Sequence, residues 1–217
     1  DYPAQTLHET IPDFHNTKAR FKVFKEAVEK DIYGRAKDVL TEIQFILERE
    51  DVANVLTDMQ LPLRVTHNDT KLNNVLIDDK THQGICVIDL DTVMPGLAIN
   101  DFGDSIRFGA STGAEDEKDL SLIQCDMHLF EVYTKGFIEG CDGKLTDEEI
   151  KALPLGAKVM TFECGMRFLT DYLQGDTYFK IRYPEHNLDR CRTQLKLVDD
   201  MEKKWDTMNE IVSKHNK

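Results

Sequence analysis

Two stretches decide the fold: Thr66-His67-Asn68-Asp69-Thr70-Lys71-Leu72-Asn73-Asn74, and Val87-Ile88-Asp89-Leu90-Asp91 shortly after it. The first predicts a loop between two short strands, in which an asparagine follows an aspartate by five residues. The second predicts an apolar strand that ends in an acid. In phosphoryl transfer, a loop aspartate orients and deprotonates the attacking hydroxyl, an asparagine holds magnesium, and a later aspartate holds magnesium against the nucleotide phosphates.

This pattern assigns an expected role to each polar residue. Asp69 is expected to orient or deprotonate the hydroxyl, while Asn74 and Asp89 offer oxygen ligands to Mg²⁺. Three assignments have alternatives, which the sequence leaves open. His67 either holds the loop by hydrogen bonds or acts as a base, Lys71 either steadies the γ-phosphate or is a solvated lysine, and Asp91 either joins the metal site or binds nearby backbone.

A second match to a kinase motif lies at Asp101-Phe102-Gly103, a tripeptide that carries magnesium in protein kinases. It follows Pro95-Gly96 instead of a β-hairpin, so we assign the metal to Asp89. Asp101 is expected to be a buried support for the catalytic loop. Asp104 and Arg107 are expected to form a structural ion network with it.

Around these stretches the chain predicts an α+β class that is mostly helical, in one domain of residues 1–217. Apolar residues three and four positions apart predict amphipathic helices, and Thr146 with Glu149 fits a capping box. The strands are expected to form one small sheet that carries the catalytic loop. The expected helices cover 17–31, 36–49, 51–59, 119–137, the segment that begins at Thr146, 154–173 and 188–212; the expected strands cover 63–66, 75–77 and 85–88; residues 1–16 and 95–113 are expected to be irregular.

Composition narrows the classes of partner. The 217 residues include 27 basic and 40 acidic side chains, for a net charge of −13. Nucleic acid or an anionic membrane as main partner would need a clustered positive face, so we expect neither. Five widely spaced cysteines suggest neither a disulfide framework nor a zinc site. With no apolar run of about 18 residues and no leader pattern, the expected location is the cytoplasm.

The run from His67 to Asn74 followed by Ile88-Asp89-Leu90-Asp91 resembles the aminoglycoside phosphotransferase and choline kinase superfamily, small-molecule kinases with a protein-kinase-like fold. More narrowly, the chain looks like the N-acetylhexosamine 1-kinase branch. The motifs behind this narrower resemblance are Phe14-His15-Asn16-Thr17, Val65 to Val75, Val87 to Gly96 and Asp101 to Gly109.

The resemblance implies Mg²⁺-dependent transfer from ATP to the anomeric hydroxyl of N-acetylglucosamine or N-acetylgalactosamine. It also implies that Asp69 meets the sugar hydroxyl, that Arg167 contacts the sugar, and that Phe108 and Tyr178 form the pocket wall. Apart from the family, an arginine on an apolar helix face needs a partner, so a structural ion pair is the alternative for Arg167.

One part of the family pattern is missing. A kinase of this fold needs an N-terminal lobe with a strand-turn-strand over the phosphates and a strand lysine, whereas the 66 residues before His67 are expected to be mostly helical, with Gly34 as their one glycine. We therefore expect the C-terminal lobe only, negligible ATP turnover, and the missing lobe of the same protein as a partner. The alternatives are an aminoglycoside or choline-type kinase and a sugar-binding module without catalysis.

Overall fold

The computed structural model describes residues 2–216, apart from the side chain of Asp58. Its α-helices are α1 (Thr17–Lys30), α2 (Leu40–Leu47), α3 (Glu50–Asp58), α4 (Ala98–Gly109), α5 (Met127–Gly140), α6 (Asp147–Lys151), α7 (Leu153–Leu173), α8 (His186–Lys203) and α9 (Trp205–His215). Its strands are β1 (Arg64–Thr66), β2 (Val75–Ile77), β3 (Gly84–Val87) and β4 (Met94–Gly96), and short 3₁₀ turns lie at Ala4–Thr6, Ala36–Asp38, Leu72–Asn74, Leu90–Thr92 and Leu120–Leu122.

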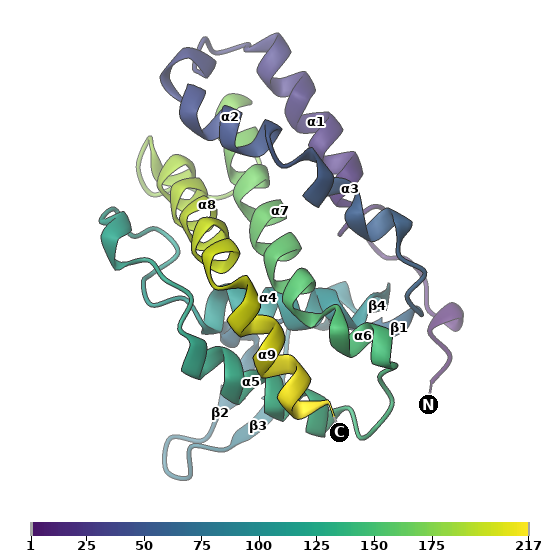
Figure 1. The fold of residues 1–217 in the computed structure, drawn as a ribbon. Helices are drawn as coiled ribbons and strands as arrows, with labels where there is room; N and C mark the ends of the chain where they lie inside the picture. Colours follow the sequence, from purple (N-terminus) through teal and green to yellow (C-terminus); the bar gives the residue numbers. More distant parts are fainter. Residues whose placement is uncertain (1, 217) are drawn as a thin grey trace.

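Helix α7 is the centre of the molecule (Figure 1). It packs against α1, α4 and α8, and nearly all of its side chains are buried. Pro154 stands in its first turn, where a missing N–H costs nothing, and Gly175 with φ +92° follows its end. A helix whose side chains are buried on nearly every side must lie inside a core, which explains its central place.

The short strands form two separate antiparallel pairs, so the expected single sheet is wrong. Strand β2 pairs with β3 as a hairpin, and β1 pairs with β4, with Val65 opposite Pro95. A pair of strands has only edges, where a proline without an N–H is tolerated. Gly96 is required there, because a Cβ at this position would collide with the Thr66 hydroxyl.

The segment 95–113 is not irregular as expected, because it contains β4 and the twelve-residue helix α4. Pro95 and Gly96 at the start of the segment indicated irregular structure, and Gly103 and Gly109 lower the local helix propensity. Tertiary packing explains Gly103, since a Cβ there would collide with the Gly156 carbonyl of α7. A glycine is needed where the two helices approach each other most closely.

Three further helix predictions have wrong bounds. The helix expected at 36–49 is a 3₁₀ turn followed by α2, which begins at Leu40 and ends at Leu47. The helix expected at 119–137 begins only at Met127, because the Asp126 carboxylate caps it by accepting bonds from the amides of His128 and Leu129. The helix expected at 188–212 is two helices that meet at Lys204. The capping box of Thr146 and Glu149, α1, α3 and α7 are confirmed, with ends within a few residues of those expected.

No helix within residues 2–216 is long and apolar enough to span a lipid bilayer.

Candidate active site

The loop between β1 and β2 is held by the first turn of α4. Asp101 accepts hydrogen bonds from the backbone amides of His67, at 2.8 Å, and Asn68, at 2.7 Å. The Thr70 hydroxyl donates to the Asp101 carbonyl oxygen at 2.6 Å. Burial raises the pKa of Asp101, and the two amide bonds offset part of that rise. These contacts give Asp101 the geometry expected of a support for the loop.

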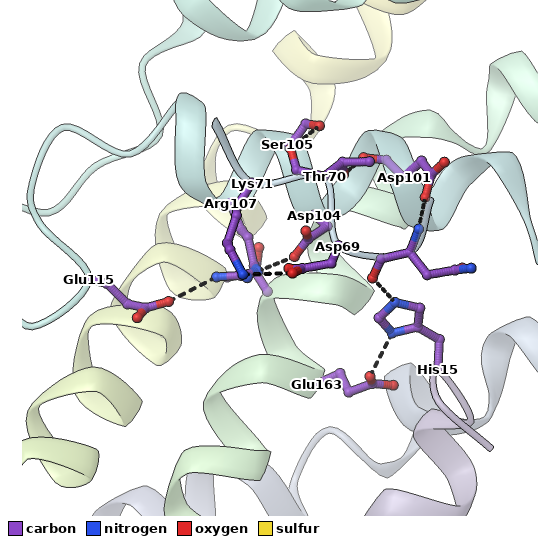
Figure 2. A network of polar contacts seen from close by, with 12 residues as sticks. His15, Asp69, Thr70, Lys71, Asp101, Asp104, Ser105, Arg107, Glu115 and Glu163 are labelled. Atoms are coloured by element: carbon purple, nitrogen blue, oxygen red, sulfur yellow. Dashed lines mark hydrogen bonds and ion pairs between the residues drawn. The ribbon is translucent and has the colours of Figure 1, made fainter. Parts of the chain in front are cut away.

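The Asp69 carboxylate lies at the centre of this loop (Figure 2). Its Oδ2 accepts a hydrogen bond from Lys71 Nζ at 2.6 Å and from Asn74 Nδ2 at 3.0 Å. Asn74 Nδ2 also donates to the Asp69 carbonyl oxygen at 2.8 Å. The Asp69 side chain is 22% exposed, so a small molecule can reach it. The structure thus brings together three residues that the motif placed in one site.

His67 joins the loop to the end of the β2–β3 hairpin. Its Nε2 lies 2.9 Å from the Ile88 carbonyl oxygen, and its Nδ1 accepts a hydrogen bond from the Asp69 amide at 3.3 Å. A neutral imidazole with its proton on Nε2 makes both bonds. The geometry therefore favours the alternative in which His67 holds the loop, and its role stays a prediction.

Of the expected metal ligands, Asn74 is buried beside Asp69, whereas Asp89 and Asp91 lie on the exposed segment that follows β3. Asp89 follows β3 with a left-handed φ of +63°, and the Ile88 amide donates to the Asn74 carbonyl oxygen at 2.9 Å, which places the end of β3 beside the loop. Asp89 and Asp91 are exposed; the Asp91 carbonyl oxygen accepts a bond from the Thr10 hydroxyl at 3.1 Å.

These residues fit a magnesium ion. Asn74 Nδ2 donates both of its hydrogen bonds to Asp69, and Asn74 Oδ1 makes no hydrogen bond to any described residue. Within residues 2–216 no three His, Cys, Asp or Glu side chains form a ready metal cluster. Mg²⁺ does not need one, since it keeps several waters and takes one or two carboxylates together with substrate phosphates.

Arg107 forms its ion pairs away from Asp101, contrary to expectation. Its guanidinium bonds to Asp104 Oδ1 at 2.6 Å through Nε and to Glu115 Oε1 at 3.1 Å through Nη1 (Figure 2). Asp101 is instead occupied by the loop amides. Glu115 was not anticipated, because it lies on an irregular segment where no periodicity indicates the direction of a side chain.

The three expected substrate residues are only partly brought together. Arg167 Nη2 donates to the Tyr178 hydroxyl at 3.4 Å, and its guanidinium lies 5.8 Å from the Phe14 ring centre and 5.5 Å from that of Phe179. Phe108 lines a different cavity of about 170 Å³, so its expected place in one pocket wall with Tyr178 is not observed. The reason is that Phe108 lies on α4, which the sequence did not predict to be a helix.

Asp171 positions the segment that carries Tyr178. Its carboxylate accepts bonds from the amides of Thr177, Tyr178 and Phe179 at 2.8–3.0 Å and from Asn187 Nδ2 at 2.8 Å. The sequence shows Asp171 only as a polar residue in an apolar helix, which is the one signal that it has partners.

A sequence model described as the phosphotransferase enzyme family matches residues 4–123, more than half of the chain. The matched region contains the loop from His67 to Asn74, the acids at 89 and 91, and α4. Arg167 and Tyr178 lie beyond it.

Proposed function

The chain belongs to the phosphotransferase enzyme family, and on that premise we propose that it serves the transfer of a phosphoryl group from ATP to a hydroxyl of a small molecule, with Asp69 as the catalytic residue. The observation that carries the proposal is the arrangement of Asp69, Lys71 and Asn74 on a loop that Asp101 holds by two backbone amides.

In this proposal the Asp69 carboxylate accepts a hydrogen bond from the acceptor hydroxyl and takes its proton as the oxygen attacks the γ-phosphorus of ATP, whose bond to the bridging oxygen breaks so that ADP leaves. One oxygen of Asp69 is already bound by Lys71 and Asn74. The other oxygen makes no bond to a described side chain and is left for the hydroxyl. Lys71 balances the negative charge beside the incoming phosphate.

Bound magnesium would neutralise charge on the nucleotide phosphates. Asn74 Oδ1 and the Asp89 carboxylate would hold the ion, and Asp91 is the further carboxylate within the same exposed turn. The chain's own contribution is to fix these oxygens beside Asp69, through the bond between the Ile88 amide and the Asn74 carbonyl.

For the acceptor we propose an N-acetylhexosamine that presents its anomeric hydroxyl to Asp69. The motifs quoted from the sequence support this choice. Arg167 lies among three aromatic rings and, with Tyr178, lines a cavity of about 100 Å³ that no residue of the Asp69 loop lines. Aromatic walls with a few polar groups are typical of small-molecule sites.

Calorimetric titration tests the acceptor without requiring turnover. N-acetylglucosamine, galactosamine and kanamycin are titrated into residues 1–217 and into the Arg167→Met variant, which keeps the length of the side chain but removes the charge. We expect the acetamido sugar to bind tightest and the variant to bind it about 10-fold more weakly. Tighter binding of kanamycin would show instead that the acceptor is a cationic aminoglycoside.

Release of ADP tests the chemistry. Since we propose that the donor-binding lobe is separate from this one, residues 1–217 alone should show negligible turnover, which robust sugar-dependent release would contradict. Wherever wild-type turnover is measurable, Asp69→Asn should lower kcat by about 10²–10⁴. The control Asp79→Asn changes an exposed acid of the β2–β3 turn and should leave kcat unchanged.

A further inference from the structure

His15 lies just before α1 and contacts both α7 and the loop of Asp69 (Figure 2). Its Nδ1 is 3.0 Å from Glu163 Oε1, and its Nε2 is 2.8 Å from the Asn68 carbonyl oxygen. The His15 side chain is 9% exposed and that of Glu163 is 1% exposed. The sequence contains this histidine in a motif but gives no indication of either partner.

Both atoms that face the ring are hydrogen-bond acceptors. A neutral imidazole carries one N–H, whereas the imidazolium carries two. With Glu163 ionised, both bonds are therefore made only when His15 is protonated. Glu163 stays an acceptor on its other side as well, because its Oε2 takes a bond from the Thr17 hydroxyl at 2.6 Å.

The electrostatic surroundings agree with this charge state. Burial works to lower the pKa of His15, but Glu163, the Asn68 carbonyl and the charge of Asp104 together outweigh it, so the pKa is raised. Burial likewise works to raise the pKa of Glu163, but His15, Arg167 and Thr17 together outweigh it, so that pKa is lowered. The other charged groups around the pair are Asp101 and Asp104 on α4, Arg167 on α7, and Glu9, Asp13 and Lys18 along the neighbouring cavity.

The bond to Asn68 matters because this carbonyl belongs to the peptide unit that joins Asn68 to Asp69. The carbonyl oxygen is held by His15, and the N–H of the same peptide, which is the Asp69 amide, donates to His67 Nδ1 at 3.3 Å. Asn68 has a left-handed φ of +65°, a conformation that costs a non-glycine residue energy and persists only when surrounding contacts hold it. The orientation of this peptide helps to set the position of the Asp69 Cα and the direction of its Cα–Cβ bond.

We propose that His15, as an imidazolium paired with Glu163, is a positioning residue that fixes the Asn68–Asp69 peptide and thereby aims the Asp69 carboxylate. We call the contacts of His15 with Glu163 and with the Asn68 carbonyl the clamp, which links α7 to the loop. Its role in catalysis rests on the function proposed above. Arg167 lies one helical turn after Glu163 on α7, so the same helix presents the proposed acceptor contact and the anchor of the clamp.

Nuclear magnetic resonance tests the clamp without turnover. In ¹⁵N-labelled residues 1–217, His15 should carry protons on both ring nitrogens and lose one only above about pH 6.5, the usual histidine pKa. Glu163→Gln removes the neighbouring charge and should lower the pH of that transition. Titration of wild-type His15 at or below about pH 6.5 would overturn the proposal.

Amide hydrogen exchange of residues 67–74 reports on the loop itself. His15→Gln should speed exchange at least about 10-fold, while His8→Gln, which changes an exposed histidine, should not. If His15→Gln misfolds, Thr17→Val serves instead, because it removes only the hydroxyl donated to Glu163 and should give a smaller acceleration. Unchanged exchange in a folded His15→Gln variant contradicts the proposal.

Kinetics then separate positioning from binding. Where turnover is measurable, His15→Gln should lower kcat about 10-fold or more with little change in KM, and wild-type kcat should fall as pH rises through the His15 transition. If Asp69→Asn leaves turnover intact while loop exchange still depends on His15, the proposed function fails and the clamp stands. If Asp69→Asn abolishes turnover but His15→Gln changes neither exchange nor kcat, only the clamp fails.

Discussion

The Glu149 carboxylate connects α6 to β1, the strand that leads into the loop of Asp69. Arg64 donates to it through Nε at 3.0 Å and Nη2 at 2.7 Å, and the Thr146 amide completes the capping box at 2.8 Å. The Glu149 side chain is 1% exposed. A two-fold arginine bond to a buried carboxylate fixes direction as well as distance, so β1 is held at a defined angle to α6.

This contact makes stability depend on pH. Burial works to raise the pKa of Glu149, but the bonds from Arg64 and Thr146 outweigh it and lower the pKa. A carboxylate whose pKa is lowered on folding stabilises above its unfolded pKa of about 4.3 and loses that contribution as pH falls through the folded value. Glu149→Gln, which keeps an acceptor for the cap, should therefore cost about 1–3 kcal/mol at pH 7 and progressively less below pH 4.

Urea unfolding at several pH values measures this difference. Glu148→Gln is the matched control. Glu148 directly precedes Glu149 on α6, and its side chain is exposed and makes no ion pair with a described residue. A loss in Glu149→Gln that stays constant down to pH 3 would show that packing, not charge, is responsible.

At the level of residues, the sequence was informative where partners are close along the chain. The contacts of Asp69 with Lys71 and Asn74 follow from a spacing of two and five residues. The partners of His15 and of Arg64 lie more than 50 residues away, and no local pattern specifies them. Such contacts depend on how the helices pack. That packing is determined by all the core residues together and not by any local sequence pattern.

Among the elements, the crossing of α4 and α7 sets the position of Asp101. Gly103 on α4 lies against the Gly156 carbonyl, and Gly156 lies against the Ile99 carbonyl, so each helix has a glycine where the other helix comes closest. Asp101 is two residues before Gly103, and it holds the loop amides of His67 and Asn68. The distance between α4 and α7 therefore affects the position of the loop that carries Asp69.

Gly103→Ala should therefore be destabilising, by about 1–3 kcal/mol, because the added methyl group has no space and the helices must move apart. Gly109→Ala is the matched control at the end of the same helix, where a Cβ would meet nothing within 4 Å. There the substitution should be neutral or stabilising by up to about 1 kcal/mol from helix propensity. Thermal unfolding of both variants measures the difference, and equal effects would contradict the packing argument.

The same crossing explains which elements sequence patterns predicted. Helices α1 and α7 have regularly spaced apolar residues, α7 also has Pro154 in its first turn and Gly175 after its end, and the bounds of both helices were predicted within a few residues. Helix α4 was missed because Gly103 lowers local helix propensity, and the compensating contact comes from Gly156 on another helix. Strand β4 was missed because Pro95 and Gly96 are poor strand residues whose pairing with β1 is a long-range contact.

In the whole molecule, two groups of buried side chains form the core. One lies among α1, α2, α3, α7 and α8 and includes Phe24 and Ile46; the other lies among α4, α5, α7, α8 and α9 and includes Ile106 and Phe130. Helices α7 and α8 contribute to both groups (Figure 1). If α7 and α8 left one group, the side chains that they contribute to the other group would be exposed as well.

We therefore expect residues 1–217 to unfold in one cooperative transition. Ile46→Val in the first group and Ile106→Val in the second should each cost about 0.5–1.5 kcal/mol, since each removes one buried methylene. Because α7 and α8 are shared, either variant should shift the whole transition to lower urea without changing its slope. Ile85→Val, at a side chain that is 64% exposed on β3, is the control and should shift nothing.

Two spectroscopic probes that report on different parts of the molecule test whether unfolding is cooperative. Far-ultraviolet circular dichroism reports on all helices, whereas fluorescence reports on Trp205, the one tryptophan of the chain, at the junction of α8 and α9. Coincident transitions are the mark of two-state unfolding. If the two groups unfolded independently, Ile46→Val would move the dichroism curve and leave the Trp205 curve in place. Coincident curves in both variants would show that α7 and α8, which contribute to both groups, join them in one cooperative unit.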